Sequence, residues 1–197
     1  VPNSGAYLIL DDVDFTDDNG NDRIDYNEEI LFNVELKNFG SQTAENITAE
    51  LSSDNDFVTI IGNVNNWDNI LPGETLLLQN AFQVFISPFV PDQQEIVFNL
   101  DISDNNENWQ SNFSFIANAP DLRVIQSAFL DFSSGNGNGI PDIGETLDII
   151  LTVYNEGNST ISEINGTLSC SNDLISIENQ NLYINQIPAH QSAQLIY

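Results

Sequence analysis

The sequence has very little positive charge and no long apolar run. Its 197 residues include three Lys or Arg against 30 Asp or Glu, for a formal net charge of -27. Binding to nucleic acid and to anionic membrane surfaces depends on Lys and Arg that neutralise phosphates. The balance therefore excludes nucleic acid as a partner. No apolar stretch approaches the length that direct insertion into a membrane needs.

Cysteine and histidine are almost absent, which leaves little for catalysis. The single Cys170 can form no disulfide within the chain, and the apolar stretch around it predicts a small buried hydrophobe. His190 is the only histidine, so a Cys–His dyad or a Ser–His–Asp set would have to use it. Neither residue lies in a catalytic motif. We therefore expect no catalytic residue and no enzyme activity in this chain.

What is present is enough for a folded, extracellular protein. The sequence is 41% hydrophobic and 10% aromatic, which suffices for a core and argues against disorder. A chain rich in Asn, Asp, Ser and Thr but nearly free of Lys and Arg suits an extracellular location. Uncompensated carboxylates repel one another, and either bound divalent cations or salt screening can relieve that repulsion. With no initiator Met and no leader pattern, we expect the chain to begin inside a longer precursor.

An internal repeat organises the chain. The tripeptide Asn19-Gly20-Asn21 recurs as Asn136-Gly137-Asn138, an offset of 117 residues. Near residue 71 one deletion changes the offset to 116, which aligns Leu71-Pro72 with Ile187-Pro188. The offset of 117 also aligns Asp14 with Asp131, Asp25 with Asp142, Glu28 with Glu145, Asn38 with Asn155, Gly40 with Gly157 and Leu51 with Leu168. Matches over this length indicate duplication.

The repeat sets the domain boundary. The stretch Ala117-Asn118-Ala119-Pro120 closes the first copy, so we predict domains at residues 1–118 and 119–197. With the offset of 116, Tyr197 corresponds to Ala81, and the second copy has no counterpart of residues 82–118. We therefore expect the second module to be C-terminally incomplete.

Hydrophobic residues alternate with a period of two, which indicates strands with one buried face. The run from Ile30 to Leu36 alternates in this way, and so does the run from Leu147 to Val153. The predicted strands of the first copy cover residues 7–14, 30–37, 43–51, 57–61, 74–86, 94–103 and 109–116. About seven strands in roughly 110 residues, with no amphipathic helix, predict an all-β chain of two immunoglobulin-like β-sandwiches.

Residues 17–28 have the oxygen spacing of a twelve-residue calcium loop. Ca²⁺ takes six to eight oxygen ligands, which alternating Asp and Asn side chains can supply while the backbone turns. Glu28 would close the shell with both carboxylate oxygens, and Arg23 would contribute its carbonyl. The full predicted set is Asp14, Asp17, Asn19, Asn21, Arg23, Asp25 and Glu28.

Residues 134–145 repeat the loop with changes. Gly139 occupies the sharp-turn position held by Asp22 in the first loop, and Ser134 replaces Asp17. The upstream carboxylate of Asp131 is expected to supply the missing charge. The full predicted set is Asp131, Ser134, Asn136, Asn138, Ile140 (through its carbonyl), Asp142 and Glu145. We expect the first loop to bind more tightly, because it holds more carboxylates.

An Asn- and Gly-rich turn without metal remains the alternative, since these residues favour turns on backbone grounds. The duplicated ligand pattern favours Ca²⁺, one ion per module and two in total. Mg²⁺ demands tighter octahedral geometry, and zinc lacks its usual Cys and His ligands. A glycan- or protein-binding role is a further alternative, for which Trp67 in the loop 63–69 is the candidate contact. Trp109 is expected in the core.

Several segments resemble a known tandem module. They include Asn19-Gly20-Asn21, Asp25-Tyr26-Asn27-Glu28, Leu36-Lys37-Asn38-Phe39-Gly40 and Trp109-Gln110-Ser111-Asn112-Phe113. The chain is similar to adhesion-type (CARDB-like) immunoglobulin-like repeats of large type IX-secreted bacterial surface proteins. It is most similar to the accessory region of gingipain-like cysteine peptidases. Asn27-Glu28 departs from the usual Gly-Glu ending, which Gly144-Glu145 keeps.

The resemblance implies a non-catalytic, calcium-stabilised spacer or accessory region of a secreted or cell-surface protein, on the outer cell surface or beyond. Its partners would be calcium and other domains of the same polypeptide or a secretion and surface apparatus. An adhesin-type module that binds glycan or a partner protein is the alternative that the resemblance also allows.

Overall fold

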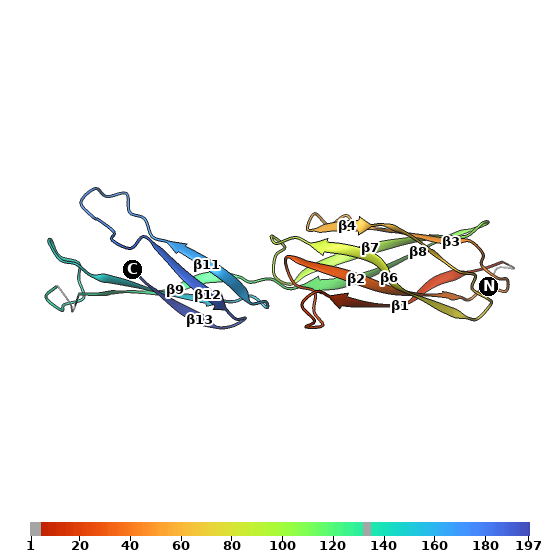
Figure 1. The fold of residues 1–197 in the computed structure, drawn as a ribbon, viewed down its shortest axis with the longest axis horizontal. Coiled ribbons are helices and arrows are strands. Elements are labelled where there is room, and N and C mark those ends of the chain that lie inside the picture. The colour runs from red at the N-terminus through yellow and green to blue at the C-terminus, as the bar shows by residue number, and fades with distance from the viewer. Residues whose placement is uncertain (1–4, 132–134) are drawn as a thin grey trace. The chain divides into compact units, whose positions relative to one another are not determined.

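A computed structural model of the chain describes residues 5–131 and 135–197. Over these residues the chain forms thirteen strands and no helix, which confirms the all-β prediction (Figure 1). The described residues accordingly include no helix long and apolar enough to cross a membrane. The chain divides into two compact units, unit 1 (Val1–Asn118) and unit 2 (Ala119–Tyr197).

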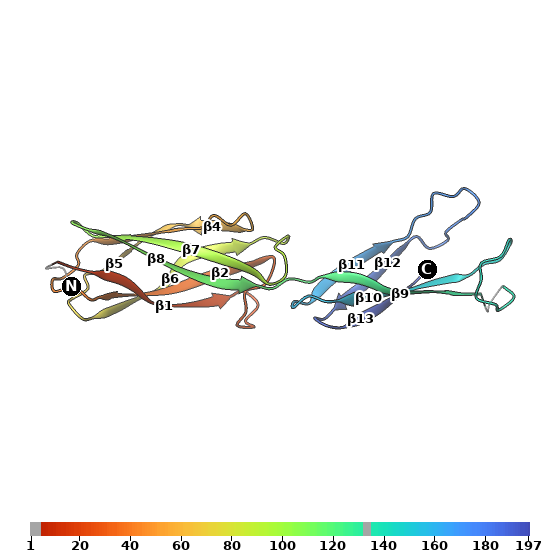
Figure 2. The same ribbon diagram turned by 180° about the vertical axis from the view of Figure 1, so that it is seen from behind.

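Unit 1 is an immunoglobulin-like sandwich of two four-stranded sheets, with strand orders β1-β2-β6-β4 and β5-β3-β7-β8 (Figures 1 and 2). The connections from β2 to β3 and from β6 to β7 pass from one sheet to the other, as in immunoglobulin domains. The strands are β1 (Leu8–Asp17), β2 (Glu28–Asn38), β3 (Ile47–Ser52), β4 (Val58–Gly62), β5 (Val64–Trp67), β6 (Thr75–Ile86), β7 (Gln94–Ser103) and β8 (Asn108–Ala117).

The core of unit 1 lies between the inward faces of these sheets. Strand β2 alternates as its sequence predicts, and the inward side chains from Ile30 to Leu36 are fully buried. Phe32 lies at the centre and contacts rings from β7 and β8, with centroids 5.1 Å from Phe98 and 5.4 Å from Phe113. Edge-to-face aromatic contacts of this kind stabilise a sandwich core beyond the area that they bury.

Strand β5 lies where the sequence indicates only an Asn-rich loop. It pairs with β3, and Trp67 at its end is 4% exposed and packs near Phe82. The prediction of Trp67 as a glycan contact is therefore wrong. A short edge strand of mostly polar residues shows no alternation of apolar and polar side chains. The sequence pattern therefore placed Trp67, its one inward aromatic residue, in a loop.

Unit 2 repeats five of the strands of unit 1 in two smaller sheets, with orders β13-β10-β9 and β11-β12. Its buried cluster is formed by Val153, Ile187 and Leu195. The strands are β9 (Leu122–Leu130), β10 (Asp148–Asn155), β11 (Ile161–Thr167), β12 (Asn181–Ile187) and β13 (Ser192–Ile196). They correspond in order to β1, β2, β3, β5 and β6.

The strand pairings correct the alignment of the first strands. Leu8 lies opposite Asn38, and Leu122 lies opposite Asn155, so β1 and β9 correspond at an offset of 114 rather than 117. Both strands carry a bulge at the same point, between Leu10 and Asp12 in β1 and between the partners of Thr152 and Val153 in β9. The structural counterpart of Asp131 is therefore Asp17, and the second copy has three more residues than the first between this position and Asn136.

The pairings also correct the alignment of the last strands. Lys37 lies opposite Thr75, and Tyr154 lies opposite Ser192, so the offset is still 117 at β13. Tyr197 therefore corresponds to Asn80 rather than Ala81. The expected deletion near residue 71 is absent, because Ile187 pairs with Ile161 just as Ile70 pairs with Ala44.

One buried Asn organises the same corner in both units. Asn38 is fully buried; its Oδ1 accepts hydrogen bonds from the N–H groups of Tyr7 (3.1 Å) and Gly40 (2.9 Å). Its Nδ2 donates to the carbonyls of Gln42 (2.8 Å) and Ile70 (2.9 Å). In unit 2, Asn155 makes the matching four bonds with Asp121, Gly157, Ser159 and Ile187. The repeated Asn-x-Gly segment is thus a structural corner, which explains its duplication without any ligand.

The glycine of each corner is required by close backbone approach. A Cβ at Gly40 would lie within 3.0 Å of backbone atoms of Gly5, Ala6 and Tyr7, and Gly157 meets Ala119, Pro120 and Asp121 in the same way. Because backbone atoms cannot move aside cheaply, we expect Gly40→Ala to destabilise unit 1 by about 2 kcal/mol or more. Urea unfolding followed by tryptophan fluorescence reports on unit 1, since both Trp residues lie there.

Gly62→Ala is the matched control for this change, because a Cβ at Gly62 meets nothing within 4 Å. Equal midpoints for Gly40→Ala and Gly62→Ala would contradict the close approach.

Candidate metal centre

Loop 1, residues 17–28, connects the end of β1 to the start of β2. Its backbone turns through a ladder of side-chain bonds: Asn19 Oδ1 accepts from the N–H of Asn21 (3.1 Å), and Asn21 Oδ1 accepts from the N–H of Arg23 (2.9 Å). Gly20 and Asp22 have φ of 71° and 59°. Turns of this kind suit Asn and Gly and direct alternate side chains to one side of the loop.

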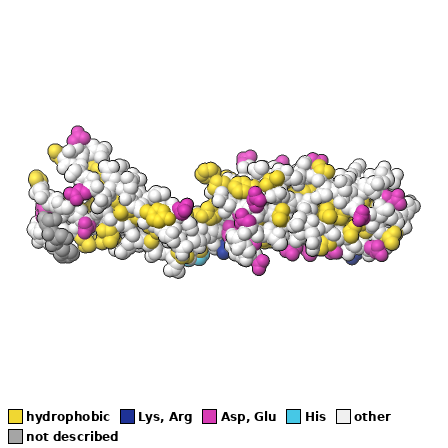
Figure 3. Space-filling model, in the orientation of Figure 1, with side chains coloured by type: hydrophobic (Ala, Val, Ile, Leu, Met, Phe, Trp, Pro, Cys, Tyr) yellow, Lys and Arg dark blue, Asp and Glu magenta, His cyan; other side chains and the backbone are white. Residues whose placement is uncertain are grey.

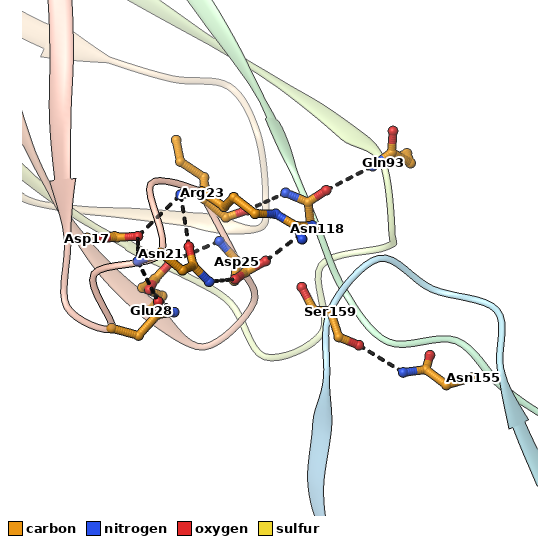
Figure 4. A network of polar contacts seen from close by, with 11 residues as sticks. Asp17, Asn21, Arg23, Asp25, Glu28, Gln93, Asn118, Asn155 and Ser159 are labelled. Carbon is orange, nitrogen blue, oxygen red and sulfur yellow. Dashed lines mark hydrogen bonds and ion pairs between the residues drawn. The ribbon is translucent and has the colours of Figure 1, made fainter. Parts of the chain in front are cut away.

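Three acidic side chains of loop 1, those of Asp17, Asp25 and Glu28, lie close to one another at this turn (Figure 4). Asp17 Oδ2 accepts from the N–H groups of Asn21 (3.0 Å) and Arg23 (3.2 Å). Asn21 Nδ2 lies 2.7 Å from Asp25 Oδ2, and Asn19 Nδ2 lies 2.5 Å from Glu28 Oε1. Side chains from both ends of the loop therefore converge.

The pKa values reflect this enclosure. Burial raises the pKa of Glu28, with smaller upward effects from a hydrogen bond with the Asp18 side chain and from the nearby carboxylates of Asp25 and Asp17. The N–H of Asp25 opposes them, and the resulting pKa is about 7. Slight burial acts in the same direction at Asp17, but hydrogen bonds from the N–H groups of Arg23 and Asn21 outweigh it and lower the pKa of Asp17. Glu28 is 2% exposed. A buried carboxylate among other acids is stabilised by either a proton or a cation.

Loop 1 is tied to the last residue of unit 1. Asn118 Nδ2 and N both donate to the carbonyl of Ile24, at 3.0 and 2.9 Å, and the N–H of Tyr26 donates to the carbonyl of Asn118 (2.8 Å). Gln93 Nε2 in turn donates to Asn118 Oδ1 (2.9 Å). Nothing in the repeat pattern marks Asn118, because no residue of the second copy aligns with it.

Loop 2, residues 134–145, has the same internal bonds over its described part, 135–145. Asn136 Oδ1 accepts from the N–H of Asn138 (3.0 Å), and Asn138 Oδ1 accepts from the N–H of Ile140 (2.6 Å). The closing glutamates also match: Glu145 Oε2 accepts from the N–H of Asp142 (3.0 Å), as Glu28 Oε2 does from Asp25 (2.9 Å).

The amides and carboxylates of loop 2 converge as those of loop 1 do. Asn136 Nδ2 and Asn138 Nδ2 lie 2.9 and 3.1 Å from Asp142 Oδ2, and the N–H of Asn136 donates to Glu145 Oε1 (3.0 Å). Left-handed positions recur as well, since Gly137, Gly139 and Gly144 correspond to Gly20, Asp22 and Asn27. Residues 19–28 and 136–145 thus share their left-handed positions and the hydrogen bonds of the turn.

Asp131 is the most unusual group of loop 2. It is 1% exposed; its Oδ2 accepts from the N–H of Gly139 (3.2 Å), while its Oδ1 is buried without a hydrogen-bond donor among the described residues. A buried carboxylate oxygen without a partner is costly. Its counterpart Asp17 likewise binds N–H groups of its loop, so both occupy the first ligand position.

Most of the predicted ligands therefore lie close together in the two loops. Asp14 is the exception, because it lies in a strand. Asp14 lies within β1 opposite Asn33, and its carboxylate accepts from the N–H of Phe15 (2.7 Å) rather than from the loop. Its inclusion rested on the offset of 117, which the strand pairings correct to 114 in this strand, so Asp14 is not the counterpart of Asp131. Ser134 lies outside the described residues. The guanidinium of Arg23 lies 3.9 Å from Asp25 Oδ1, a contact that the sequence did not suggest.

The residues present fit a hard cation. Ca²⁺ prefers carboxylate, amide and carbonyl oxygens, and each loop brings such groups within hydrogen-bond distance of one another. Amide side chains can rotate to offer oxygen in place of nitrogen, since the two are isosteric. Among the described residues no three Asp, Glu, His or Cys side chains already form a metal-binding group. Each candidate site thus depends on Asn and carbonyl oxygens as well as carboxylates.

Other predicted features lie away from the loops. Cys170 is exposed, so its prediction as a buried hydrophobe was wrong. His190 has φ of 58° and corresponds to Gly73, which has φ of 83°. His190 thus occupies a turn position that the repeat explains.

Comparison with models of known families gave no match, and no curated protein sequence matches the chain. Among the solved structures that resemble it, two show how weak the likeness is. One is the CsuC–CsuE chaperone–tip adhesion subunit pre-assembly complex from archaic chaperone-usher Csu pili of Acinetobacter baumannii. It has 11% identity and a TM-score of 0.28, covering 88% of this chain and 85% of that chain. The other is the YadV chaperone, with 13% identity, a TM-score of 0.28 and coverage of 93% and 83%. Likeness at this level carries no inference about function.

Proposed function

We propose that this chain is a non-catalytic, calcium-stabilised accessory or spacer region of a secreted or cell-surface protein, with one Ca²⁺ in each unit. The observation that carries the proposal is the duplicated loop conformation around buried acids, Glu28 in loop 1 and Asp131 in loop 2. Burial of a carboxylate is costly unless its charge is neutralised. Each of the two loops buries one carboxylate, and a bound ion in each loop would offset that cost. The resemblance to repeats of gingipain-like peptidases supports the extracellular location.

In loop 1 the residues that would hold the ion are Asp17, Asn19, Asn21, Arg23 (carbonyl), Asp25 and Glu28. In loop 2 they are Asp131, Asn136, Asn138, Ile140 (carbonyl), Asp142 and Glu145. A bound cation would neutralise acids that otherwise repel one another. It would also fix loop 1 against Asn118, the last residue of unit 1. Acids are spread widely over the visible surface, with few Lys or Arg among them (Figure 3), so few local cations are available to do this.

Thermal melts with calcium and with chelator test the proposal. At about 100-fold excess over Kd we expect a gain of about 2.7 kcal/mol per site, because calcium binds the folded state alone. Titration calorimetry should give two ions per chain. Glu28→Gln should remove one ion and Asp131→Asn the other, whereas the exposed neighbour Glu29→Gln should leave both. Equal midpoints with millimolar calcium and with chelator would reject a stabilising metal.

A second candidate function, glycan binding, is favoured by an open groove on the sheet β5-β3-β7-β8. The groove has a volume of about 620 Å³ and includes Glu50, Asp101, Trp109 and Gln110 among its walls. Gln110 Nε2 donates to Asp101 Oδ1 (2.7 Å), which holds a polar pair on the outward face of the sheet. Trp109 lies opposite the buried Ile102, so its side chain is on the inward face. Amide and carboxylate groups that line a groove can hydrogen-bond the hydroxyls of a sugar.

For this second function we expect Asp101→Ala to weaken glycan binding about tenfold, since a hydrogen bond contributes up to about 1.5 kcal/mol. Glycan-array signal for the wild type and the variant measures the change. Glu29→Ala removes an exposed carboxylate outside the groove and serves as the control. A wild-type chain that binds no glycan on the array removes this candidate.

A further inference from the structure

The sheet of unit 2 that contains β11 has two strands, whereas the corresponding sheet of unit 1, which contains β3, has four. In unit 1, β3 pairs with β5 on one side and with β7 on the other. In unit 2, β11 corresponds to β3 and pairs with β12, the counterpart of β5. Figures 1 and 2 show β11 and β12 as a separate two-stranded ribbon, and no other strand of the described residues pairs with β11.

The correspondence across this edge is fixed residue by residue. Ile47 lies opposite Trp67 in unit 1, and Ile164 lies opposite Ile184 in unit 2, an offset of 117 on both strands. Asn46 and Glu163, which share that offset, have φ of 56° and 55°. The free edge of β11 is therefore the edge that β3 uses to bind β7.

The apolar face behind β11 is also less covered than its counterpart. Phe32 and Val34 are fully buried, whereas their counterparts Ile149 and Leu151 are only partly buried. In unit 1 the cover comes from Phe98 on β7 and from rings on β8. Hydrophobic side chains are visible on the surface of unit 2 in Figure 3.

The exposure of the Phe129 ring is a second indication that the apolar face of unit 2 is less covered than that of unit 1. Phe15, the counterpart of Phe129, packs edge to face on Phe115 of β8, with centroids 5.3 Å apart. Phe129 is 45% exposed, whereas Phe15 is only partly exposed beside that ring.

We propose that the free edge of β11 is a docking site for an antiparallel β-hairpin with apolar residues at every second position. The occupant's chemistry follows from unit 1, where β7 presents Ile96, Phe98, Leu100 and Ile102 inward, each at most 1% exposed. Addition of a strand to a free edge supplies main-chain hydrogen bonds, and alternate side chains supply specificity. The docking site does not depend on calcium, so it can fail or hold independently of the proposed function.

The test appends a copy of residues 81–118 after Tyr197, since Tyr197 corresponds to Asn80. Hydrogen exchange measured by NMR on the full chain reports on the amides of β11. We expect their protection to rise at least about tenfold when the appended hairpin docks, because exchange then requires it to leave.

Two variants of the appended copy make the test specific. In the first, the inward positions copied from Ile96, Phe98 and Leu100 become Ser, and protection of β11 should be lost. In the second, the outward positions copied from Glu95, Val97 and Asn99 become Ser, and protection should remain. Protection of β11 that does not change on appending the hairpin, or that is equal in both variants, overturns the proposal. So does a dimer of the unmodified chain with β11 already protected, because the occupant is then a second copy.

Discussion

Replacing Asn38 by Ala is expected to lower the unfolding free energy of unit 1 by about 4 kcal/mol. The change removes four hydrogen bonds, with the N–H groups of Tyr7 and Gly40 and the carbonyls of Gln42 and Ile70. Of these four backbone groups, the Ile70 carbonyl keeps a hydrogen bond from the Ala44 N–H. Each buried backbone group left unpaired costs about 1–3 kcal/mol, and partial access of water to the Tyr7 end reduces the total. The effect is large because one side chain holds three chain segments together.

Urea unfolding of the full chain, followed by tryptophan fluorescence, measures this loss. Asn99→Ala is the matched control, since Asn99 lies on the exposed face of β7. Asn38→Asp separates the two halves of the network, because it keeps the acceptor oxygen and loses the donor. A loss below 1 kcal/mol for Asn38→Ala would falsify the structural role of this corner.

The stability of unit 1 without metal is expected to fall as pH rises from about 4.5 to about 7. Burial raises the pKa of Glu28 from 4.5 to about 7, so the folded state holds a proton that the unfolded state releases at lower pH. The stabilisation from this proton is complete below the unfolded pKa and is lost as pH rises through the folded pKa. A shift of this size corresponds to about 3 kcal/mol.

Calcium should reverse this dependence, since it requires the ionised carboxylate and its effect therefore grows with pH. Melts at several pH values, with chelator and with calcium, measure both slopes. Glu28→Gln should flatten the chelator curve between pH 4.5 and 7, whereas Glu29→Gln, which alters an exposed carboxylate on the same strand, should not. A chelator curve that is already flat for the wild type speaks against the buried acid.

Local patterns in the sequence predicted the strands and the loops well. Alternation from Ile30 to Leu36 predicted β2, because one face of that strand is fully buried. The repeated Asn, Asp and Glu residues predicted loop conformations that the hydrogen bonds now show to be equivalent. Such features depend on residues close together in the chain, so a single sequence contains the necessary information.

Features that depend on distant residues were missed or misplaced. Asp14 was assigned to loop 1 because one offset was applied throughout, whereas strand pairing shows an insertion after Asp131. Trp67 was assigned to a loop because its strand is stabilised by pairing with β3 rather than by its own pattern. The bonds between Asn118 and Ile24 join residues 94 apart, which no local pattern indicates.

That distance between Ile24 and Asn118 has a kinetic consequence. Loop 1 begins near the start of unit 1, yet Asn118, which binds it, is the last residue of the unit to be synthesised. Contacts so far apart in sequence form late, because the whole intervening chain must first be ordered. Loop 1 should therefore reach its final conformation only after all eight strands of unit 1 have paired. Until residue 118 has been synthesised, the folding of loop 1 stays incomplete.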